Sequence, residues 1–238
     1  MNLLIIIILG ILSYLLGSIP SGYLIAKIVR KIDIRKLGSN STGATNTSRV
    51  LGFKYGLLAL FFDALKGIII MAILVIFKLD QYYIVNIFDN PTNILAIYGL
   101  ISVIGHIYPI FLNFKGGKAV ATSFGVVLFL TPLLALMGVF ILVSIVYITK
   151  YVSLASIITG VSIFLVSIFF AIFNVNIMKD MATPGLPLIP IEYAIVYGLM
   201  ASIIILKHKQ NIIRLISGEE NKFSIKKWEF TLIFFIFF

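Results

Sequence analysis

"AVATSFGVVLFLTPLLALMGVFILVSIVYIT", residues 119–149, is the stretch that decides the fold. It is apolar almost throughout, but it is longer than the roughly 20 residues that a helix needs to cross a bilayer. Thr131 and Pro132 stand near its middle. Proline lacks an amide hydrogen and disfavours the helical conformation in the residue before it. We therefore expect a helix break here, and a short helical hairpin in place of one long span.

The charges around this run decide between the two arrangements. Lys and Arg gather in 27–54, 115–118 and 207–227, whereas 78–92 and 174–192 hold a single lysine each. Since basic loops remain on the cytoplasmic side of a membrane, all three basic clusters should lie there. One span would leave 207–227 outside, but a hairpin places every cluster inside. The sequence thus predicts an all-α membrane protein of about seven transmembrane helices with its N-terminus outside.

The composition agrees with a polytopic membrane protein. Of the 238 residues 61% are hydrophobic, and the mean hydropathy is +1.12. We expect a single membrane domain over 1–227 and an apolar tail, 228–238, that is too short to span and lies at the interface. The first apolar run has no basic segment before it, which favours a span over a signal peptide. The other expected spans are 3–27, 55–77, 93–113, 152–173 and 191–206.

The same composition excludes several kinds of chemistry. The chain has no cysteine and two histidines, so a disulfide, a thiolate nucleophile and a Cys- or His-rich metal site are not expected. We expect no metal and no cofactor. The net charge of +10 lies in the loops, which favours membrane topology and anion binding over nucleic acid.

The unusual polar segments all fall on the predicted cytoplasmic face: 17–22, 36–49, 114–118, 150–156 and 207–222. In "KLGSNSTGATNTSR", 36–49, Gly38 and Gly43 permit a positive φ and a close approach of the backbone. Exposed amides in such a loop form an anion nest if a helix follows, and Arg49 adds a planar phosphate contact. The alternative is a solvated loop of turn and cap residues.

Two further segments are basic. "FKGGKA", 114–119, places Lys115 and Lys118 around Gly116 and Gly117, which would free backbone amides for an anion. The alternative is a pair of lysines that only sets topology. "KHKQNIIRL", 207–215, presents His208, Asn211 and either Arg214 or Leu215 on one helix face, where His208 would donate to a phosphate or accept a hydroxyl proton. The alternative is a basic helix lying on anionic lipid.

Polar residues within the spans have plainer interpretations. Ser153 and Ser156, in "YVSLAS", are typical packing residues. Asp63 and Lys66, three residues apart, are expected to pair with each other. His106 is expected to be a hydrogen-bonded residue at the interface.

These motifs together resemble one protein family. "GSIPSGYLIAK", "GSNSTGATNTSRVLG", "GHIYPIFLNFKGGKAVAT", "YVSLAS" and "KHKQNIIRLISGEENK", spread over 17–222, are similar to the bacterial acyl-phosphate:glycerol-3-phosphate acyltransferases. The resemblance implies a seven-helix enzyme of the bacterial cytoplasmic membrane with its active-site loops inside. It implies transfer of a fatty acyl group from acyl phosphate to the sn-1 hydroxyl of glycerol 3-phosphate, giving lysophosphatidic acid and inorganic phosphate. Neither acyl-CoA nor acyl carrier protein would be the direct donor, membrane lipid would surround the protein, and we expect a monomer.

The resemblance also assigns residues. The phosphate-binding loop falls on Gly38 to Asn46, and the matching substrate-binding residues are Gly38, Ser39, Asn40, Ser41, Gly43, Ala44, Thr45, Asn46 and Arg49, to which the basic turn adds Lys115, Gly116 and Gly117. The residues assigned to catalysis are Lys118, Ser153, His208 and Asn211, while Glu220 is structural and holds down the C-terminal segment. Two residues depart from the family pattern: Ser41 replaces an Asn, and Ala119 stands where many members have Gly.

An activated donor shapes the expected mechanism. Acyl phosphate carries its own leaving group, so positioning and charge stabilisation suffice without a covalent nucleophile. The loop at 38–46 would bind the acyl-phosphate head group, and Ser153 would hydrogen-bond the acceptor or the developing oxyanion. The hydroxyl proton would go either to His208 or to a substrate phosphate oxygen. A phosphate-ester transporter, a thioester-dependent acyltransferase and a non-catalytic scaffold are the competing interpretations.

Overall fold

The computed structural model describes residues 3–79, 82, 84–87, 90–173 and 189–223. The chain forms two compact units, Met1–Leu130 and Thr131–Phe238, and each is described by itself. The single domain expected over 1–227 stays a prediction. The predicted interfacial tail, 228–238, lies outside the described residues.

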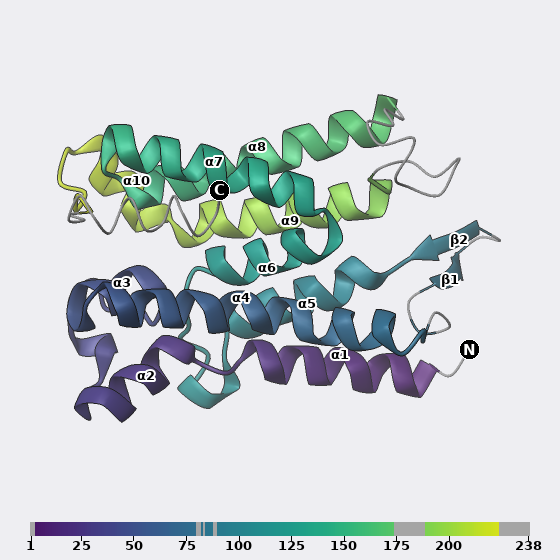
Figure 1. Ribbon diagram of the computed structural model, residues 1–238, viewed down its shortest axis with the longest axis horizontal. Coiled ribbons are helices and arrows are strands. Elements are labelled where there is room, and N and C mark those ends of the chain that lie inside the picture. The colour runs from purple at the N-terminus through teal and green to yellow at the C-terminus, as the bar shows by residue number, and fades with distance from the viewer. Residues whose placement is uncertain (1–2, 80–81, 83, 88–89, 174–188, 224–238) are drawn as a thin grey trace. The chain divides into compact units, whose positions relative to one another are not determined.

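The first unit is built around α4 (Phe53–Ile76), which contacts α1, α5 and α6 (Figure 1). Short helices α2 and α3 pack against each other and against α4. A small antiparallel ribbon of β1 and β2 precedes α5, with Ile84 opposite Asn93. The other elements of this unit are α1 (Leu3–Gly17), α2 (Ser21–Arg30), the 3-10 turn η1 (Ile34–Lys36), α3 (Ala44–Leu51), β1 (Ile84–Ile87), β2 (Asn90–Asn93), α5 (Leu95–Ile107), the 3-10 turn η3 (Ile110–Leu112) and α6 (Val120–Leu130).

Apart from this short ribbon, the elements of the described residues are helical, which confirms the all-α prediction. The ribbon lies in a segment expected to be a loop between two spans. Ile84, Val85 and Ile87 are β-branched residues, which favour the extended conformation. A strand of four residues is too short to show the alternation of apolar and polar residues by which a strand is predicted.

The second unit is a helical layer in which α8 (Val152–Phe173) contacts both α7 (Pro132–Thr149) and α9 (Ile191–Lys207) (Figure 1). A short amphipathic helix, α10 (Lys209–Ile216), follows α9 after a bend of 58° and contacts α8. His208 occupies the bend.

The predicted helix break at Thr131 and Pro132 is confirmed. Helix α6 ends at Leu130 and α7 begins at Pro132, while Thr131 has φ −145° and ψ 75°. Proline at the first position of a helix loses no intrahelical hydrogen bond, which makes this a favourable start. The hydroxyls of Thr131 and Tyr197 share a buried hydrogen bond of 2.8 Å, so the polar group at the break is satisfied.

The helices are those of a membrane protein. Within the described residues, four stretches are long and apolar enough to cross a bilayer: α4, Leu95–Leu112, α7 and α8. Two bent pairs, α1 with α2 and α9 with α10, raise the number to six if each pair is one span. Large apolar side chains face outwards, as at Ile148 and Phe173, which are 77% and 64% exposed. With 11 residues, α6 is shorter than a full span, as expected for the first arm of the interrupted run.

Glycines bring the helices of the first unit very close. A Cβ at Gly17 would lie 2.1 Å from the Ser102 carbonyl oxygen, and one at Gly125 would lie 2.0 Å from that of Ala64. Small residues allow backbones to approach in this way where lipid supplies no hydrophobic driving force between helices. The contacts fix α1 on α5 and α6 on α4, and so fix the loops at the ends of these helices.

Candidate active site

The loop at 38–46 is folded around one buried side chain, that of Asn46. Its Nδ2 donates to the carbonyl oxygens of Ile34 (3.3 Å), Leu37 (3.1 Å) and Ser41 (2.8 Å). Its Oδ1 accepts the amide of Ser39 at 2.8 Å. The two amide hydrogens are therefore fully used within the loop. The role that this geometry gives Asn46 is to shape the loop, and not to donate to a ligand.

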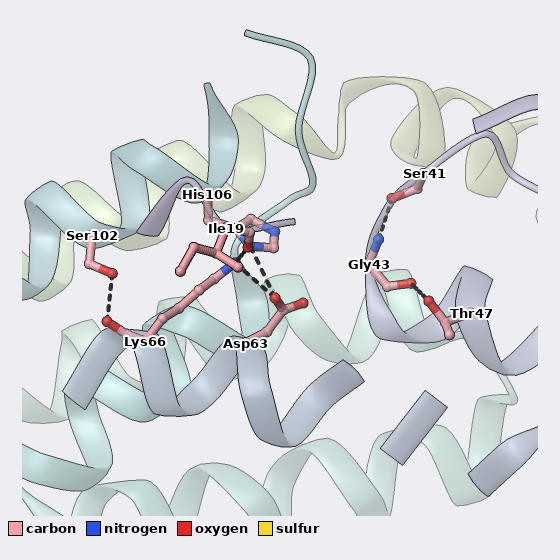
Figure 2. A network of polar contacts seen from close by, with 8 residues as sticks. All are labelled: Ile19, Ser41, Gly43, Thr47, Asp63, Lys66, Ser102 and His106. Carbon is pink, nitrogen blue, oxygen red and sulfur yellow. Dashed lines mark hydrogen bonds and ion pairs between the residues drawn. The ribbon is translucent and has the colours of Figure 1, made fainter. Parts of the chain in front are cut away.

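The two glycines of this loop have different tasks. Gly38 has φ +60°, and a Cβ there would lie 2.3 Å from Asn46 Oδ1. Gly43 has φ −78° and does not use the freedom that the sequence suggested. It precedes α3, its amide donates to Ser41 Oγ at 3.3 Å, and its carbonyl accepts from Thr47 Oγ1 at 3.1 Å (Figure 2).

Helix α3 begins at Ala44, as the anion-nest interpretation requires. Within the described part of the chain, the backbone amides of Ala44 and Thr45 have no hydrogen-bond acceptor. Gly38, Ser39 and Asn40 in the loop are exposed, and so is Arg49 on helix α3. Free amides at a helix start attract an anion. This end of the first unit therefore has the chemistry of a phosphate site.

The turn at 114–119 serves packing, which corrects one prediction. The amides of Gly116 and Gly117 donate to the carbonyl oxygens of Ile107 and His106, both at 3.2 Å. They are not free for an anion. A Cβ at Gly116 would lie 2.1 Å from the His106 carbonyl oxygen, and one at Gly117 would lie 2.2 Å from His106 Nε2. Glycine is needed here because the turn sits directly on α5. Lys115 is exposed and Lys118 is half-buried.

Ala119, the last residue of this turn, has a left-handed conformation, with φ +59°, and is buried. This conformation costs an L-residue roughly 1–2 kcal/mol that glycine does not lose. We expect Ala119→Gly to raise the melting temperature of the detergent-purified protein, with the gain reduced by the greater flexibility of glycine when unfolded. Ala155→Gly, in helix α8, is the matched control and should lower the melting temperature. A lower melting temperature for Ala119→Gly would contradict the strain.

Asp63, Lys66 and His106 form a buried cluster (Figure 2). The predicted Asp63–Lys66 pair is confirmed, with Lys66 Nζ 2.8 Å from Asp63 Oδ1. His106 Nδ1 lies 3.6 Å from the same oxygen, beyond hydrogen-bond distance, and the ring is 6% exposed. The expected hydrogen bond of the ring is therefore not made at Nδ1, while the position of His106 at the membrane interface stays a prediction. The signal for this cluster was the presence of two charges, Asp63 and Lys66, within the expected apolar span at 55–77.

In the second unit, the carboxylate of Glu220 gathers three side chains. Oε1 accepts from Ser153 Oγ (2.8 Å) and Asn211 Nδ2 (2.7 Å), and Oε2 accepts from Arg214 Nε (2.8 Å). These contacts join the start of α8, helix α10 and the segment after it. The amide of Phe223 adds a bond to the Lys150 carbonyl oxygen at 2.8 Å. A role in holding down the C-terminal segment requires contacts of this kind.

This arrangement sets the charge of Glu220 and the direction of the Ser153 hydrogen bond. Burial alone would raise the pKa of Glu220, but hydrogen bonds from Arg214, Asn211 and Ser153 outweigh it and lower the pKa below its ordinary value. A serine hydroxyl has one hydrogen, which Ser153 donates to Glu220. In this geometry the hydroxyl hydrogen positions the carboxylate, and the expected hydrogen bond from Ser153 to the acceptor or to the developing oxyanion stays a prediction.

His208 is buried at the bend between α9 and α10, with Nδ1 2.8 Å from the Ile204 carbonyl oxygen. Because a carbonyl only accepts, Nδ1 carries the hydrogen, and in the neutral ring Nε2 is the basic nitrogen. The helical spacing predicted for His208, Asn211 and Arg214 is present, since α10 runs over Lys209–Ile216. The described residues contain no group of three or more His, Asp or Glu side chains suited to a metal ion.

The sequence matches one family along nearly its whole length. A family model described as glycerol-3-phosphate acyltransferase matches residues 7–218. The glycerol-3-phosphate acyltransferase of Staphylococcus haemolyticus is 40% identical over 227 residues, covering 94% of this chain and 98% of that protein. That of Aquifex aeolicus is 42% identical over 216 residues, covering 90% and 97%.

Solved structures agree with this result. The crystal structure of PlsY, an integral membrane glycerol 3-phosphate acyltransferase, in its glycerol 3-phosphate form is 37% identical with a TM-score of 0.76, covering 92% of this chain and 96% of that one. Its lysophosphatidic acid form is 36% identical with a TM-score of 0.75, covering 95% and 98%. This chain is therefore a multi-pass membrane enzyme that belongs to the glycerol-3-phosphate acyltransferase family.

Proposed function

We propose that the protein transfers a fatty acyl group from acyl phosphate to the sn-1 hydroxyl of glycerol 3-phosphate. The products are lysophosphatidic acid and inorganic phosphate, as in a first acylation step of phospholipid synthesis. The main support is the pair of related structures, whose forms hold glycerol 3-phosphate and lysophosphatidic acid, the acceptor and the acylated product. The acyl donor is inferred from the chemistry of this chain.

The chain offers the parts that an activated donor needs. The sequence has no cysteine and shows no recognisable serine–histidine–aspartate set, so a covalent acyl intermediate is not part of the proposal. In direct transfer the hydroxyl oxygen attacks the acyl carbon, the bond from that carbon to the phosphate oxygen breaks, and the hydroxyl proton leaves. Phosphate is a good leaving group, so binding and charge stabilisation supply the catalysis. With a thioester donor, the loop at 38–46 would have no acyl-phosphate head group to bind.

Each unit contributes its own residues to this scheme. In the first unit, the α3 start binds the acyl-phosphate head group, and Arg49 and Lys118 bind the glycerol-phosphate anion. The second unit holds two further residues assigned to catalysis, His208 and Asn211, and there Ser153 and Glu220 hold Asn211 in place. Asn211 donates one of its two amide hydrogens to Glu220, which fixes the direction of the other.

We propose seven membrane crossings with the N-terminus outside, and the short helix α6 is counted as one of the seven. We also propose that the protein is a monomer in the bacterial cytoplasmic membrane. Light scattering in detergent checks the monomeric state.

Single introduced cysteines test the orientation in the membrane, because the chain has no cysteine of its own that would react with the label. In intact cells, an impermeant maleimide should label Thr92→Cys and leave Leu37→Cys and Ser217→Cys unlabelled. Labelling of the last two would overturn the orientation.

A turnover assay tests the proposed reaction. Purified protein with palmitoyl phosphate and glycerol 3-phosphate should release phosphate and lysophosphatidic acid in equal amounts, measured by mass spectrometry. Removal of one preorganised donor to the reacting charge costs about 10²–10³ in kcat, so Arg49→Ala should lose about a hundredfold. Arg35→Ala, in the same basic region but paired with Asp33 at 2.8 Å, is the matched control and should stay within about threefold. Product from palmitoyl-CoA alone, or uptake of glycerol 3-phosphate into proteoliposomes without acylation, would contradict the proposal.

The acceptor of the hydroxyl proton is either His208 Nε2 or a phosphate oxygen of the substrate. General-base catalysis contributes about 10²–10⁴ in rate. If His208 is the base, His208→Gln should reduce kcat by at least a hundredfold and abolish the acid limb of the pH profile. If kcat stays near normal with an unchanged pH profile, the proton goes to the substrate phosphate.

A further inference from the structure

The cluster of Asp63, Lys66 and His106 is a buried polar group that the proposed reaction does not use. The three residues are 1%, 5% and 6% exposed, in the middle of an apolar unit. Replacing a buried ion pair with apolar residues is often neutral or stabilising, and charges within a membrane are costly. Stability alone therefore does not account for the cluster. Its contacts point instead to two loops of the first unit.

Lys66 holds the first of these loops. Besides Asp63, its Nζ donates to the Ile19 carbonyl oxygen at 2.9 Å (Figure 2). Ile19 lies where α1 ends and α2 has not begun, so its carbonyl has lost its helical partner. Three residues on, a Cβ at Gly22 would lie 2.2 Å from the Thr42 carbonyl oxygen and 2.5 Å from Thr47 Oγ1. Helix α2, which Lys66 holds through Ile19, therefore packs directly against the loop at 38–47.

His106 holds the second loop. One edge of its ring faces Asp63, with Nδ1 3.6 Å from Oδ1. The other edge lies against Gly117, where an added Cβ would be 2.2 Å from Nε2. The carbonyl oxygen of His106 also accepts the Gly117 amide at 3.2 Å. The ring therefore fills the space between the Asp63 carboxylate and the turn that precedes Lys118.

We propose that Asp63, Lys66 and His106 are positioning residues, which hold the loop at 38–47 and the turn at 115–118 in a fixed relation for phosphate binding. This proposal rests on the proposed function. Lys66 sets one loop through Ile19, His106 sets the other through Gly117, and Asp63 joins the two. Displacement of a binding group by about 1 Å is enough to cost up to a hundredfold in rate, so such a brace affects substrate binding without touching substrate.

A double-mutant cycle on His106 and Gly117 tests it. We expect Gly117→Ala to weaken glycerol 3-phosphate binding about tenfold, since its methyl group displaces the turn. His106→Ala should weaken it to a similar extent by removing the support. In the double variant the methyl group enters the space left by the ring, so binding should exceed that of Gly117→Ala alone, a strong departure from additivity. Calorimetry with glycerol 3-phosphate measures these affinities, and KM values for both substrates accompany them.

The controls separate positioning from a loss of stability. Ser13→Ala removes a buried bond from α1 to the Tyr98 carbonyl oxygen, away from both loops, and should lower the melting temperature with KM unchanged. His106→Ala should raise KM for glycerol 3-phosphate more than it lowers kcat. Additive effects, or equal changes in both KM values that follow melting temperature, would overturn the proposal. If the wild type binds glycerol 3-phosphate and the cycle holds but palmitoyl phosphate is not consumed, only the proposed donor fails.

Discussion

Replacing Glu220 with Ala should cost about 3–5 kcal/mol of stability and most of the activity. The carboxylate accepts three hydrogen bonds, and its loss leaves Ser153 and Asn211 buried without their acceptor. Breaking a buried charged network by removing one partner has a cost of this size. At about 2–4 °C per kcal/mol, the melting temperature should fall by roughly 10 °C. Thermal unfolding in detergent measures the change, and turnover measured well below the transition separates activity from folding.

Glu220→Gln is the graded control. The amide oxygen can keep the bonds from Ser153 and Asn211, but the amide nitrogen faces Arg214 in place of Oε2. The stability loss should therefore be about 1–3 kcal/mol, the value of one charged hydrogen bond, reduced because Arg214 is partly exposed. An equal loss for the Gln and Ala variants would show that the charge, and not the three-way contact, carries the effect.

The lowered pKa of Glu220 adds a pH dependence with a definite sign. Between the lowered folded pKa and the ordinary value near 4.5, the unfolded chain binds more protons than the folded one. The contribution of this carboxylate is therefore fully present above that ordinary value and is lost as the pH falls through the folded pKa. Stability should decline on acidification below about pH 5. Glu220→Gln should show a smaller decline, and an identical one would contradict this assignment.

The features of the fold that depend only on residues adjacent in the sequence could be predicted from it. The break at Pro132 follows from the missing amide hydrogen, and the apolar runs from the length that a bilayer demands. The ribbon at 84–93 was missed because two four-residue strands show no period. The sharp bend at His208 was also invisible, since 207–215 has ordinary helical spacing.

The residue types of the candidate site could be predicted from the sequence, but the partners that their backbone amides and side chains contact could not. Gly116 and Gly117 were assigned to free amides, yet neither has a positive φ, whereas nearby Asn113, Phe114 and Ala119 do. Glycine is required at both positions because a Cβ there would clash with His106, a residue of another segment. Likewise, nothing in the periodicity of α8 shows that Ser153 donates to a carboxylate 67 residues away. Such contacts are set by tertiary packing, and no spacing within one segment reveals them.

Replacing Asn46 with Ala should abolish most activity by collapsing the loop at 38–46. Its side chain makes four hydrogen bonds to the backbone and is 1% exposed. Loss of this one group leaves the Ser39 amide and three carbonyl oxygens to find other partners. The start of α3 then loses its preorganised shape, and loss of a preorganised anion site costs about 10²–10³ in kcat. Turnover with palmitoyl phosphate, and a melting temperature to exclude global unfolding, measure the effect.

Asn46→Asp distinguishes a shaping role from a ligand contact. The two side chains have nearly the same size, and Asp can still accept the Ser39 amide. Its second oxygen, however, would face the carbonyl oxygens of Leu37 and Ser41, which now accept from Nδ2 at 3.1 and 2.8 Å. Acceptors opposed in a buried site repel, so the Asp variant should be at least as inactive as the Ala variant and should recover partly at low pH, where a protonated carboxyl can donate. If Asn46 instead contacted the substrate directly, the Asp variant would keep the loop fold and the melting temperature and lose affinity for the anionic substrate alone.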